Sequence, residues 1–236
     1  RMKKKKVLLI GWDAADWDVI DQLMEQGRMP ALKNFLENGV RGKLATYDPP
    51  VSPMLWTSIA TGKNPEKHGV LGFIEPTPDG KGLRPLLSTS RKVKAIWNIL
   101  NQNDYKTNVI GWWPSHPAEP LNGAMVSNFY QMVTENDPAK WKMDDGTVHP
   151  PEISKQLEEL RVHPKELTFA HILPFVPLMN LVDQEKDKNL EVVSKLISHG
   201  SCIQNAVTWL LENTEWDFTA VYFDMIDHFS HLGMRY

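Results

Sequence analysis

The chain has little of three features that would place it in a special class of protein: cysteine, long apolar runs and charge of one sign. Its single cysteine, Cys202, cannot form an internal disulfide, and we expect it to be a small buried apolar side chain. No stretch approaches the roughly 20 apolar residues that cross a bilayer, so a membrane span is not expected. The formal net charge of -3, without a basic run beyond the first residues, argues against a nucleic acid duplex as a partner.

What is present is an ordinary globular composition. Of the 236 residues, 42% are hydrophobic and 23% are charged, which allows one large domain or two small ones with a substantial core. The start, RMKKKK, is basic like a signal peptide, but the apolar run after it spans only residues 7–10. A secretory signal needs roughly 7 to 15 apolar residues, so we expect a cytoplasmic protein whose first strand follows a solvated lysine tail.

Short apolar runs alternate with segments of helical periodicity along most of the chain. The first run, bounded by Gly11, has the continuous apolar character of a buried parallel strand. The strands predicted in this way cover residues 6–12, 40–46, 107–112, 124–127 and 218–223. Helices are predicted over residues 16–29, 30–37, 53–61, 92–101 and 182–213, with Gly200 as a candidate break in the last. This order predicts an α/β domain built on a largely parallel sheet.

Two segments depart from this alternation. Residues 71–92 are rich in Gly and Pro, which predicts a long exposed loop of the kind that often carries function. Residues 132–180 are rich in Pro, Asp, Glu and Lys without an obvious strand, which indicates a helical insertion or cap. We therefore divide the chain into an N-terminal part of the α/β domain at 1–131, the insertion at 132–180 and a return to the domain at 181–236. A central strand so close to Tyr236 also leads us to expect that the domain continues beyond it.

Two aspartates are predicted at the carboxyl ends of separate strands, where open α/β sheets bind ligands. They are Asp13, after the first strand, and Asp224, after the last. His228 follows Asp224 by four residues, so on a helix both side chains would lie on one face about a turn apart. A carboxylate and an imidazole at that separation can share a divalent ion, and the nitrogen ligand favours zinc.

Structural interpretations of the same residues stay open at this point. Asp224 could cap the helix that follows the strand, and His228 could be a buried histidine bonded to a backbone carbonyl. Asp227 and His231 repeat the four-residue spacing and compete for the role of a ligand pair.

Ser52, in the stretch DPPVSPMLWTSIATG, also has two interpretations. It could cap the helix that begins at Pro53, because a serine oxygen satisfies free amides there and proline suits a first turn. It could also be a nucleophile, because the positive end of the helix dipole attracts phosphate and a bound metal can remove the hydroxyl proton. The two roles are compatible.

Other residues carry weaker expectations. His68, between a short turn and a glycine, suits a structural hydrogen bond better than catalysis. His116, after another predicted strand end, could border a substrate. The nine tryptophans mostly fall at core spacings, and we expect them in the core rather than in a stacking platform.

Three of these segments occur in a specific order: the first strand with Asp13, then PPVSPMLWTSIATGKNPEKHG, then VYFDMIDH. In that order they resemble the alkaline phosphatase superfamily, and its type I phosphodiesterase / nucleotide pyrophosphatase branch best. The stretch GWWPSHPAEPLNGAMVSN is also similar to bacterial members of that branch. The resemblance implies an α/β, alkaline-phosphatase-like three-layer sandwich with a largely parallel central sheet and a helical insertion. Ala14 departs from the family, which often has glycine after the first aspartate.

The resemblance also implies a site. Ser52 would be the nucleophile and a ligand of the same metal as Asp13, and Asp224 and His228 would bind a second metal. It implies two divalent ions, with zinc expected, and places the remaining ligands in later sequence.

The implied activity is metal-dependent hydrolysis of phosphate esters, as diesters or pyrophosphates, through a phosphoseryl intermediate. The substrate would be a small-molecule phosphate ester or a nucleotide-like compound. Two alternatives remain. One is a non-catalytic member that binds a phosphorylated ligand or a protein partner, because the chain supplies only two apparent ligands for each metal. The other is a phosphomutase of the same superfamily.

Overall fold

The computed structural model describes residues 5–234, over which strands and helices alternate. The strands are β1 (Val7–Trp12), β2 (Ile74–Pro76), β3 (Leu83–Pro85), β4 (Thr107–Ile110), β5 (Gly123–Val126), β6 (Val148–His149) and β7 (Phe218–Phe223). The helices are α1 (Trp17–Glu25), α2 (Pro30–Glu37), α3 (Ser52–Thr61), α4 (Pro65–His68), α5 (Ile96–Asn101), α6 (Ser154–Glu159), α7 (Phe169–Ile172), α8 (Asn189–Asn213) and α9 (Met225–Gly233).

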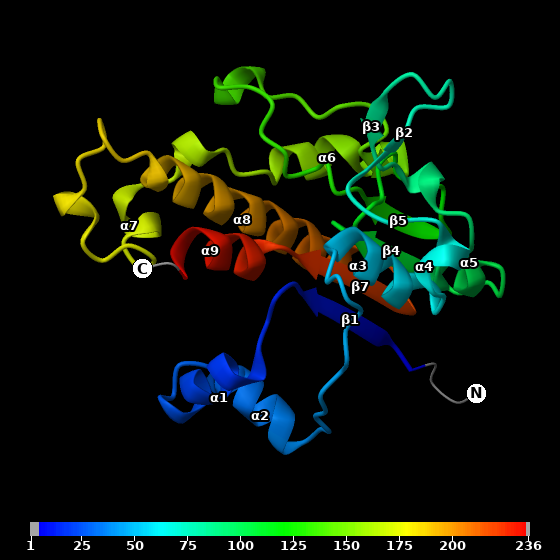
Figure 1. Ribbon diagram of the computed structural model, residues 1–236, viewed down its shortest axis with the longest axis horizontal. Coiled ribbons are helices and arrows are strands. Elements are labelled where there is room, and N and C mark those ends of the chain that lie inside the picture. Colours follow the sequence, from blue (N-terminus) through cyan, green and yellow to red (C-terminus); the bar gives the residue numbers. More distant parts are fainter. Residues whose placement is uncertain (1–4, 235–236) are drawn as a thin grey trace.

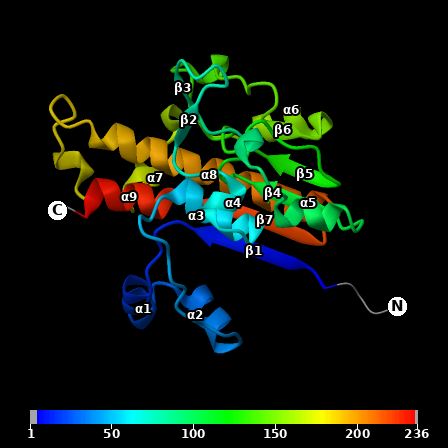
Figure 2. The ribbon, with the colours of Figure 1, turned by 45° about the vertical axis from the view of Figure 1, so that its right-hand side comes forward.

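Five strands form the central sheet in the order β1-β7-β4-β5-β6. The first four run parallel, and the short β6 pairs antiparallel with β5. β7, the last strand along the chain, lies between β1 and β4 and is buried over most of its length. Figures 1 and 2 show this strand, in orange, beside the blue β1. The carboxyl ends of β1 and β7 therefore meet at one edge of the sheet.

Helices pack on both faces of the sheet. Side chains alternate between the two faces along each strand, and apolar side chains on both faces need cover. Ile110, Val126 and Val221 point to one side and pack with α8. Their neighbours Val109, Met125 and Ala220 point to the other side and pack with residues of α3 and α5. The three layers confirm the predicted α/β fold with a mostly parallel central sheet.

One predicted strand is absent. Residues 40–46 form no strand, and Val40 and Leu44 are 100% and 87% exposed. The segment connects α2 to α3 (Figure 1) and pairs with no strand among the described residues. β1 also differs from the expectation of a buried strand. It pairs with β7 alone among the described residues, and most of its side chains are exposed.

Three further segments differ from the prediction. Residues 71–92 contain the two-stranded hairpin of β2 and β3 rather than a loop throughout. Residues 132–180 contain β6 as well as short helices, so the insertion contributes one edge strand to the sheet. α8 begins at Asn189 rather than near residue 182, because Asp183 accepts a hydrogen bond from the Glu185 amide and starts a turn. The domain boundaries at 131 and 180 stay predictions.

Gly200 does not interrupt α8, which is continuous. Gly200 instead allows α9 to approach α8 closely. A Cβ at this position would lie 1.6 Å from the sulfur of Met225, which is in the first turn of α9. Cys202, also on α8, is buried as expected, and burial raises its pKa to about 11. None of the helices within residues 5–234, α8 included, has the length and apolar character needed to cross a membrane.

We expect Gly200→Ala to lower the free energy of unfolding by about 1–3 kcal/mol, because the added methyl group overpacks the contact between α8 and α9. The measurement is chemical denaturation followed by circular dichroism. Gly233→Ala is the matched control, since a Cβ at this helical glycine meets nothing within 4 Å. Equal stability of the two variants would contradict the close contact.

Candidate active site

The parallel pairing of β1 with β7 brings Asp13 and Asp224 together. Trp12 is in register with Phe223, and the Asp13 amide donates to the Phe223 carbonyl at 3.0 Å. The two aspartates are the next residues on their strands, so they leave the sheet side by side. The buried Tyr222 hydroxyl donates to Asp13 Oδ2 at 2.7 Å and fixes that carboxylate. The sequence prediction of two strand-end carboxylates at one edge is confirmed.

Two carboxylate and imidazole pairs form on α9. His228 Nδ1 lies 3.8 Å from Asp224 Oδ2, and His231 Nε2 lies 3.4 Å from Asp227 Oδ1. Asp224 occupies the cap position of α9, but its side chain makes no capping hydrogen bond. Asp224 and His228 line a cavity, whereas His231 is largely exposed to solvent. The structure therefore favours the first pair over the second as part of a site.

Negative charge accumulates at this edge. Burial raises the pKa of Asp224, and Asp13 and Asp227 add to that rise while His228 opposes it. Burial also raises the pKa of Tyr222, and the nearby Asp13 carboxylate adds to the shift. Like charges held together in a partly buried place favour the binding of a cation.

Ser52 opens α3 without capping it. Val51 takes the cap position, and no side chain makes a capping hydrogen bond there. No other group of residues 5–234 bonds to the Ser52 hydroxyl, so the capping interpretation is wrong. Both ribbon views place the start of α3 next to the carboxyl ends of β1 and β7 (Figures 1 and 2).

Trp56, one turn after Ser52, attaches α3 to this edge of the sheet. A Cβ at Gly11 would lie 2.5 Å from the Trp56 ring, so glycine is needed for the contact. The rings of Trp56 and Tyr222 are 4.8 Å apart between centroids. Asp13 and Trp56 line one open cavity of about 440 Å³. The helix that carries Ser52 is thus packed directly against the strand ends that carry the aspartates.

His68 holds the other end of α3. It is fully buried, its Nδ1 accepts from the Val70 amide at 3.1 Å, and its Nε2 lies 2.9 Å from Ser58 Oγ. With Nδ1 accepting, the neutral ring carries its proton on Nε2 and donates to Ser58. His68 therefore has the structural role that the sequence favoured.

A second cavity, of about 250 Å³, is lined by Asp224 and His228. Four aromatic residues also line it, Phe73, Trp113, Phe129 and Tyr222, and we call it the aromatic cavity. Phe73 comes from the segment just before β2, so the Gly- and Pro-rich region does help to form a pocket. Trp113 is an exception to the expectation that the tryptophans are core residues.

Two further lining residues, Gln131 and His199, were not predicted from the sequence. His199 lies on α8, where burial lowers its pKa to about 4 and keeps the imidazole neutral at pH 7. Its sequence signal was a histidine beside Leu196 and Ile197 in an apolar stripe. Gln131 follows β5 in an irregular segment and had no such signal.

His116 lies behind the aromatic cavity and does not line it. Its ring stacks on Phe129 with 4.1 Å between centroids and 4° between planes. Its Nδ1 lies 3.1 Å from Ser127 Oγ, and its amide donates to Asn128 Oδ1. His116 therefore holds Phe129 in place, and direct contact with a substrate stays a prediction.

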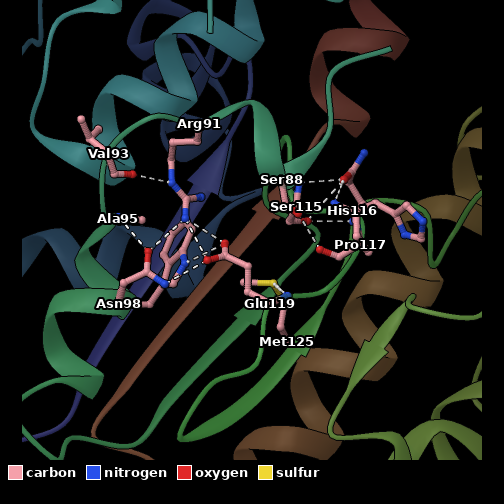
Figure 3. A network of polar contacts seen from close by, with 12 residues as sticks. Ser88, Arg91, Val93, Ala95, Asn98, Ser115, His116, Pro117, Glu119 and Met125 are labelled. Atoms are coloured by element: carbon pink, nitrogen blue, oxygen red, sulfur yellow. Dashed lines mark hydrogen bonds and ion pairs between the residues drawn. The ribbon is translucent and has the colours of Figure 1, made fainter. Parts of the chain in front are cut away.

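A buried ion pair supports the segment that carries Trp113 and His116. Figure 3 shows Arg91 bonded to both carboxylate oxygens of Glu119 at 2.9 Å, with Asn98 bonded to both partners. A single guanidinium nitrogen of Arg91 donates to both oxygens, and the Arg91 side chain is 7% exposed, so this charge-assisted contact is largely shielded from water. This network makes the cavity wall a fixed part of the fold.

A metal site is incomplete within residues 5–234. No three His, Cys, Asp or Glu side chains in that part of the chain gather closely enough to hold a metal ion by themselves. Asp13 and the Asp224–His228 pair therefore supply fewer ligands than the four that zinc usually takes.

The chain is similar to one known protein family over most of its length. The family model of type I phosphodiesterase / nucleotide pyrophosphatase matches residues 7–234. The chain belongs to this family. The family is a branch of the alkaline phosphatase superfamily, and its members are phosphoric ester hydrolases. No curated protein and no solved structure matches the chain.

The backbone at Ala14 has a conformation that favours glycine. This residue has a φ of 58°, in the left-handed region that glycine adopts most easily. A glycine after the first aspartate, as the family often has, suits this sharp turn. Ala14 keeps the same conformation at a cost of about 1–2 kcal/mol.

We expect the stability of the fold to fall as the pH decreases below about 6.5. Burial lowers the pKa of His68 from its ordinary value of 6.5, and the nearby Glu66 opposes this only in part. Below pH 6.5 the unfolded chain therefore binds a proton that the folded state excludes. The free energy of unfolding decreases as a result. The stabilisation that comes from the neutral His68 ring is fully present above pH 6.5.

The measurement is urea unfolding between pH 7.5 and pH 5, on the wild type and on His68→Gln. The variant lacks the titrating group, so its stability should change less over this range. The same pH dependence in both proteins would show that His68 is not its source.

Proposed function

We propose that this protein hydrolyses phosphate diesters or pyrophosphates through a phosphoseryl intermediate on Ser52. Family membership supports phosphoric ester hydrolysis in general. The observation that carries the finer proposal is that Ser52 opens α3 without capping it, and both ribbon views place the start of α3 next to the strand ends that hold Asp13 and Asp224 (Figures 1 and 2). A cytoplasmic location stays a prediction of the sequence.

The first turn of α3 suits a phosphoryl group. α3 has ten residues, and its positive dipole end lies at Ser52, where the first amides have no partner within the helix. Backbone amides at such a helix start bind phosphate oxygens. A substrate phosphoryl group bound there would lie against the Ser52 hydroxyl.

The reaction then has two steps. Ser52 Oγ forms a bond to phosphorus while the bond from phosphorus to the leaving-group oxygen breaks, and the serine proton leaves with the departing alcohol. Water then attacks the phosphoserine, the Oγ–phosphorus bond breaks, and Ser52 recovers its proton. α3 holds Ser52 in position for both steps, so much of the rate enhancement would come from positioning and charge stabilisation.

The side chains at the sheet edge are of the types that bind divalent ions, but they are too few to complete the coordination of two ions by themselves. Carboxylates, a hydroxyl and an imidazole are suitable zinc ligands, and Tyr222 leaves the second oxygen of Asp13 available. Asp13 and Ser52 would hold one ion, and Asp224 and His228 the other, with substrate oxygens and water as further ligands. Bound divalent ions would lower the pKa of the hydroxyl and neutralise phosphoryl charge.

A non-catalytic role in binding a phosphorylated ligand or a protein partner is the second candidate. It is favoured by the absence of a three-donor metal cluster within residues 5–234. A phosphomutase would use the same phosphoserine but transfer the group to another hydroxyl. Product analysis separates these three, because only hydrolysis releases the phosphoryl group to water.

Ser52→Ala should reduce kcat for bis(4-nitrophenyl) phosphate by about a thousandfold or more, because the variant has no nucleophile. Release of nitrophenol is measured with zinc present. Ser154→Ala is the matched control, because Ser154 also opens a helix without a capping bond. Full activity of Ser52→Ala would rule out the phosphoseryl intermediate.

Zinc binding should weaken at least tenfold in Asp224→Asn and in His228→Gln, since each variant removes a proposed ligand. Isothermal titration with zinc gives the dissociation constants. His231→Gln should leave them unchanged, because its pair with Asp227 has the same spacing but lies outside the aromatic cavity. An equal loss in all three variants would argue against a specific role for the Asp224–His228 pair.

A further inference from the structure

The Asp13 carboxylate has a single hydrogen-bond donor within residues 5–234, and this donor is the Tyr222 hydroxyl. It donates to Oδ2 across 2.7 Å, a length typical of a hydrogen bond to a charged carboxylate. Oδ1 receives no such bond from the described part of the chain. The two oxygens of Asp13 are therefore not equivalent, because the protein occupies one and leaves the other for a ligand.

The Tyr222 side chain is held in place by its surroundings. The residue is 4% exposed, and it belongs to β7, which lies between β1 and β4 in the sheet. Its ring contacts those of Trp56 and Trp112, with centroid distances of 4.8 and 6.4 Å. A cation that reaches Asp13 therefore meets a carboxylate whose Oδ2 is already occupied, because the strand and two indole rings fix the hydroxyl.

The proposed ligands of the first ion do not select a metal by themselves. Asp13 and Ser52 offer oxygen atoms alone, whereas the second ion would also bind a nitrogen of His228. Oxygen ligands suit calcium and magnesium as well as zinc. Calcium takes about six to eight oxygens and accepts both oxygens of one carboxylate, whereas zinc usually takes about four ligands in all. The number of oxygens that Asp13 can give therefore affects which ion binds.

We propose that Tyr222 is a positioning residue that restricts Asp13 to one ligating oxygen and thereby favours zinc over calcium. With Oδ2 bound to the hydroxyl, Asp13 offers Oδ1 alone. A calcium ion then loses a ligand that it would use, and a zinc ion does not. The hydroxyl also orients the carboxylate before the metal arrives, as groups that bond to metal ligands commonly do. The inference rests on the proposed function, which assigns one ion to Asp13 and Ser52.

Tyr222→Phe tests the inference, because it removes the hydroxyl and keeps the ring that packs on Trp56. Zinc affinity at the ion held by Asp13 should fall about tenfold, since a group that orients a metal ligand is lost. Calcium affinity should stay the same or rise, because Oδ2 becomes available. Isothermal titration with each metal alone, in an Asp224→Asn background that weakens the second site, gives the two constants. An unchanged ratio of zinc to calcium affinity would overturn the proposal.

Tyr130→Phe is the matched control. Tyr130 is also buried, and its hydroxyl donates to the Leu157 carbonyl at 2.7 Å. This variant loses a buried hydrogen bond of the same length, but one that involves no proposed metal ligand. Its ratio of zinc to calcium affinity should equal that of the wild type. An equal fall in both variants would show that a loosened core, and not the bond to Asp13, sets the preference.

Infrared spectroscopy provides a second test that does not require Tyr222→Phe to fold. Difference spectra on addition of zinc are recorded for the wild type and for Asp13→Asn, so that the bands lost in the variant belong to Asp13. We expect the band positions of a carboxylate that binds the metal through one oxygen. Bands of a carboxylate that binds through both oxygens would overturn the proposal.

Metal binding and turnover are measured separately, so this inference and the proposed function can fail independently. A fall in the zinc preference of Tyr222→Phe, with no hydrolysis of bis(4-nitrophenyl) phosphate by the wild type, would remove the proposed function and keep the role of Tyr222. Hydrolysis by the wild type with an unchanged preference in Tyr222→Phe would do the reverse. Zinc affinity that does not depend on Asp13 would also overturn the inference, whatever the activity.

Discussion

The parallel pairing of β1 with β7 is the constraint on which the candidate site depends. Asp13 accepts a hydrogen bond from Tyr222, 209 positions away in the sequence, and this contact exists only because the last described strand returns to the first. The pairing places two carboxylates at one edge of the sheet, beside the start of α3. Without it, each aspartate would simply end its own strand.

This arrangement has an energetic cost that is consistent with its proposed use. Two carboxylates that share a partly buried edge repel each other, and burial raises the pKa of Asp224. The fold offsets part of this cost with the Tyr222 hydroxyl and with His228, four residues after Asp224. A cation would offset more. The helix start at Ser52 adds a positive dipole end, which favours an anionic phosphoryl group in the same place.

The aromatic cavity shows how distant segments of the chain build a single pocket. Phe73 precedes the hairpin of β2 and β3, Trp113 follows β4, Phe129 follows β5, and His199 belongs to α8. Gly200 lets α9 pack closely against α8 next to His199, and this contact fixes where Asp224 begins that helix. The Arg91–Glu119 ion pair holds the Trp113 segment from behind. Packing on several elements therefore determines the shape of the pocket.

The sequence by itself determined the elements whose signals are local. The apolar run 218–223 matches β7 residue for residue, the helix predicted from Pro53 is α3 to within one residue, and the order of the motifs indicated the family. Tertiary structure decided what depends on a partner. Residues 40–46 have a strand-like pattern but pair with no strand, although β1 lies at the edge of the sheet. The nine tryptophans gave no sign that Trp113 would line a pocket. Gln131 and His199 became neighbours of one cavity through packing, which no local pattern encodes.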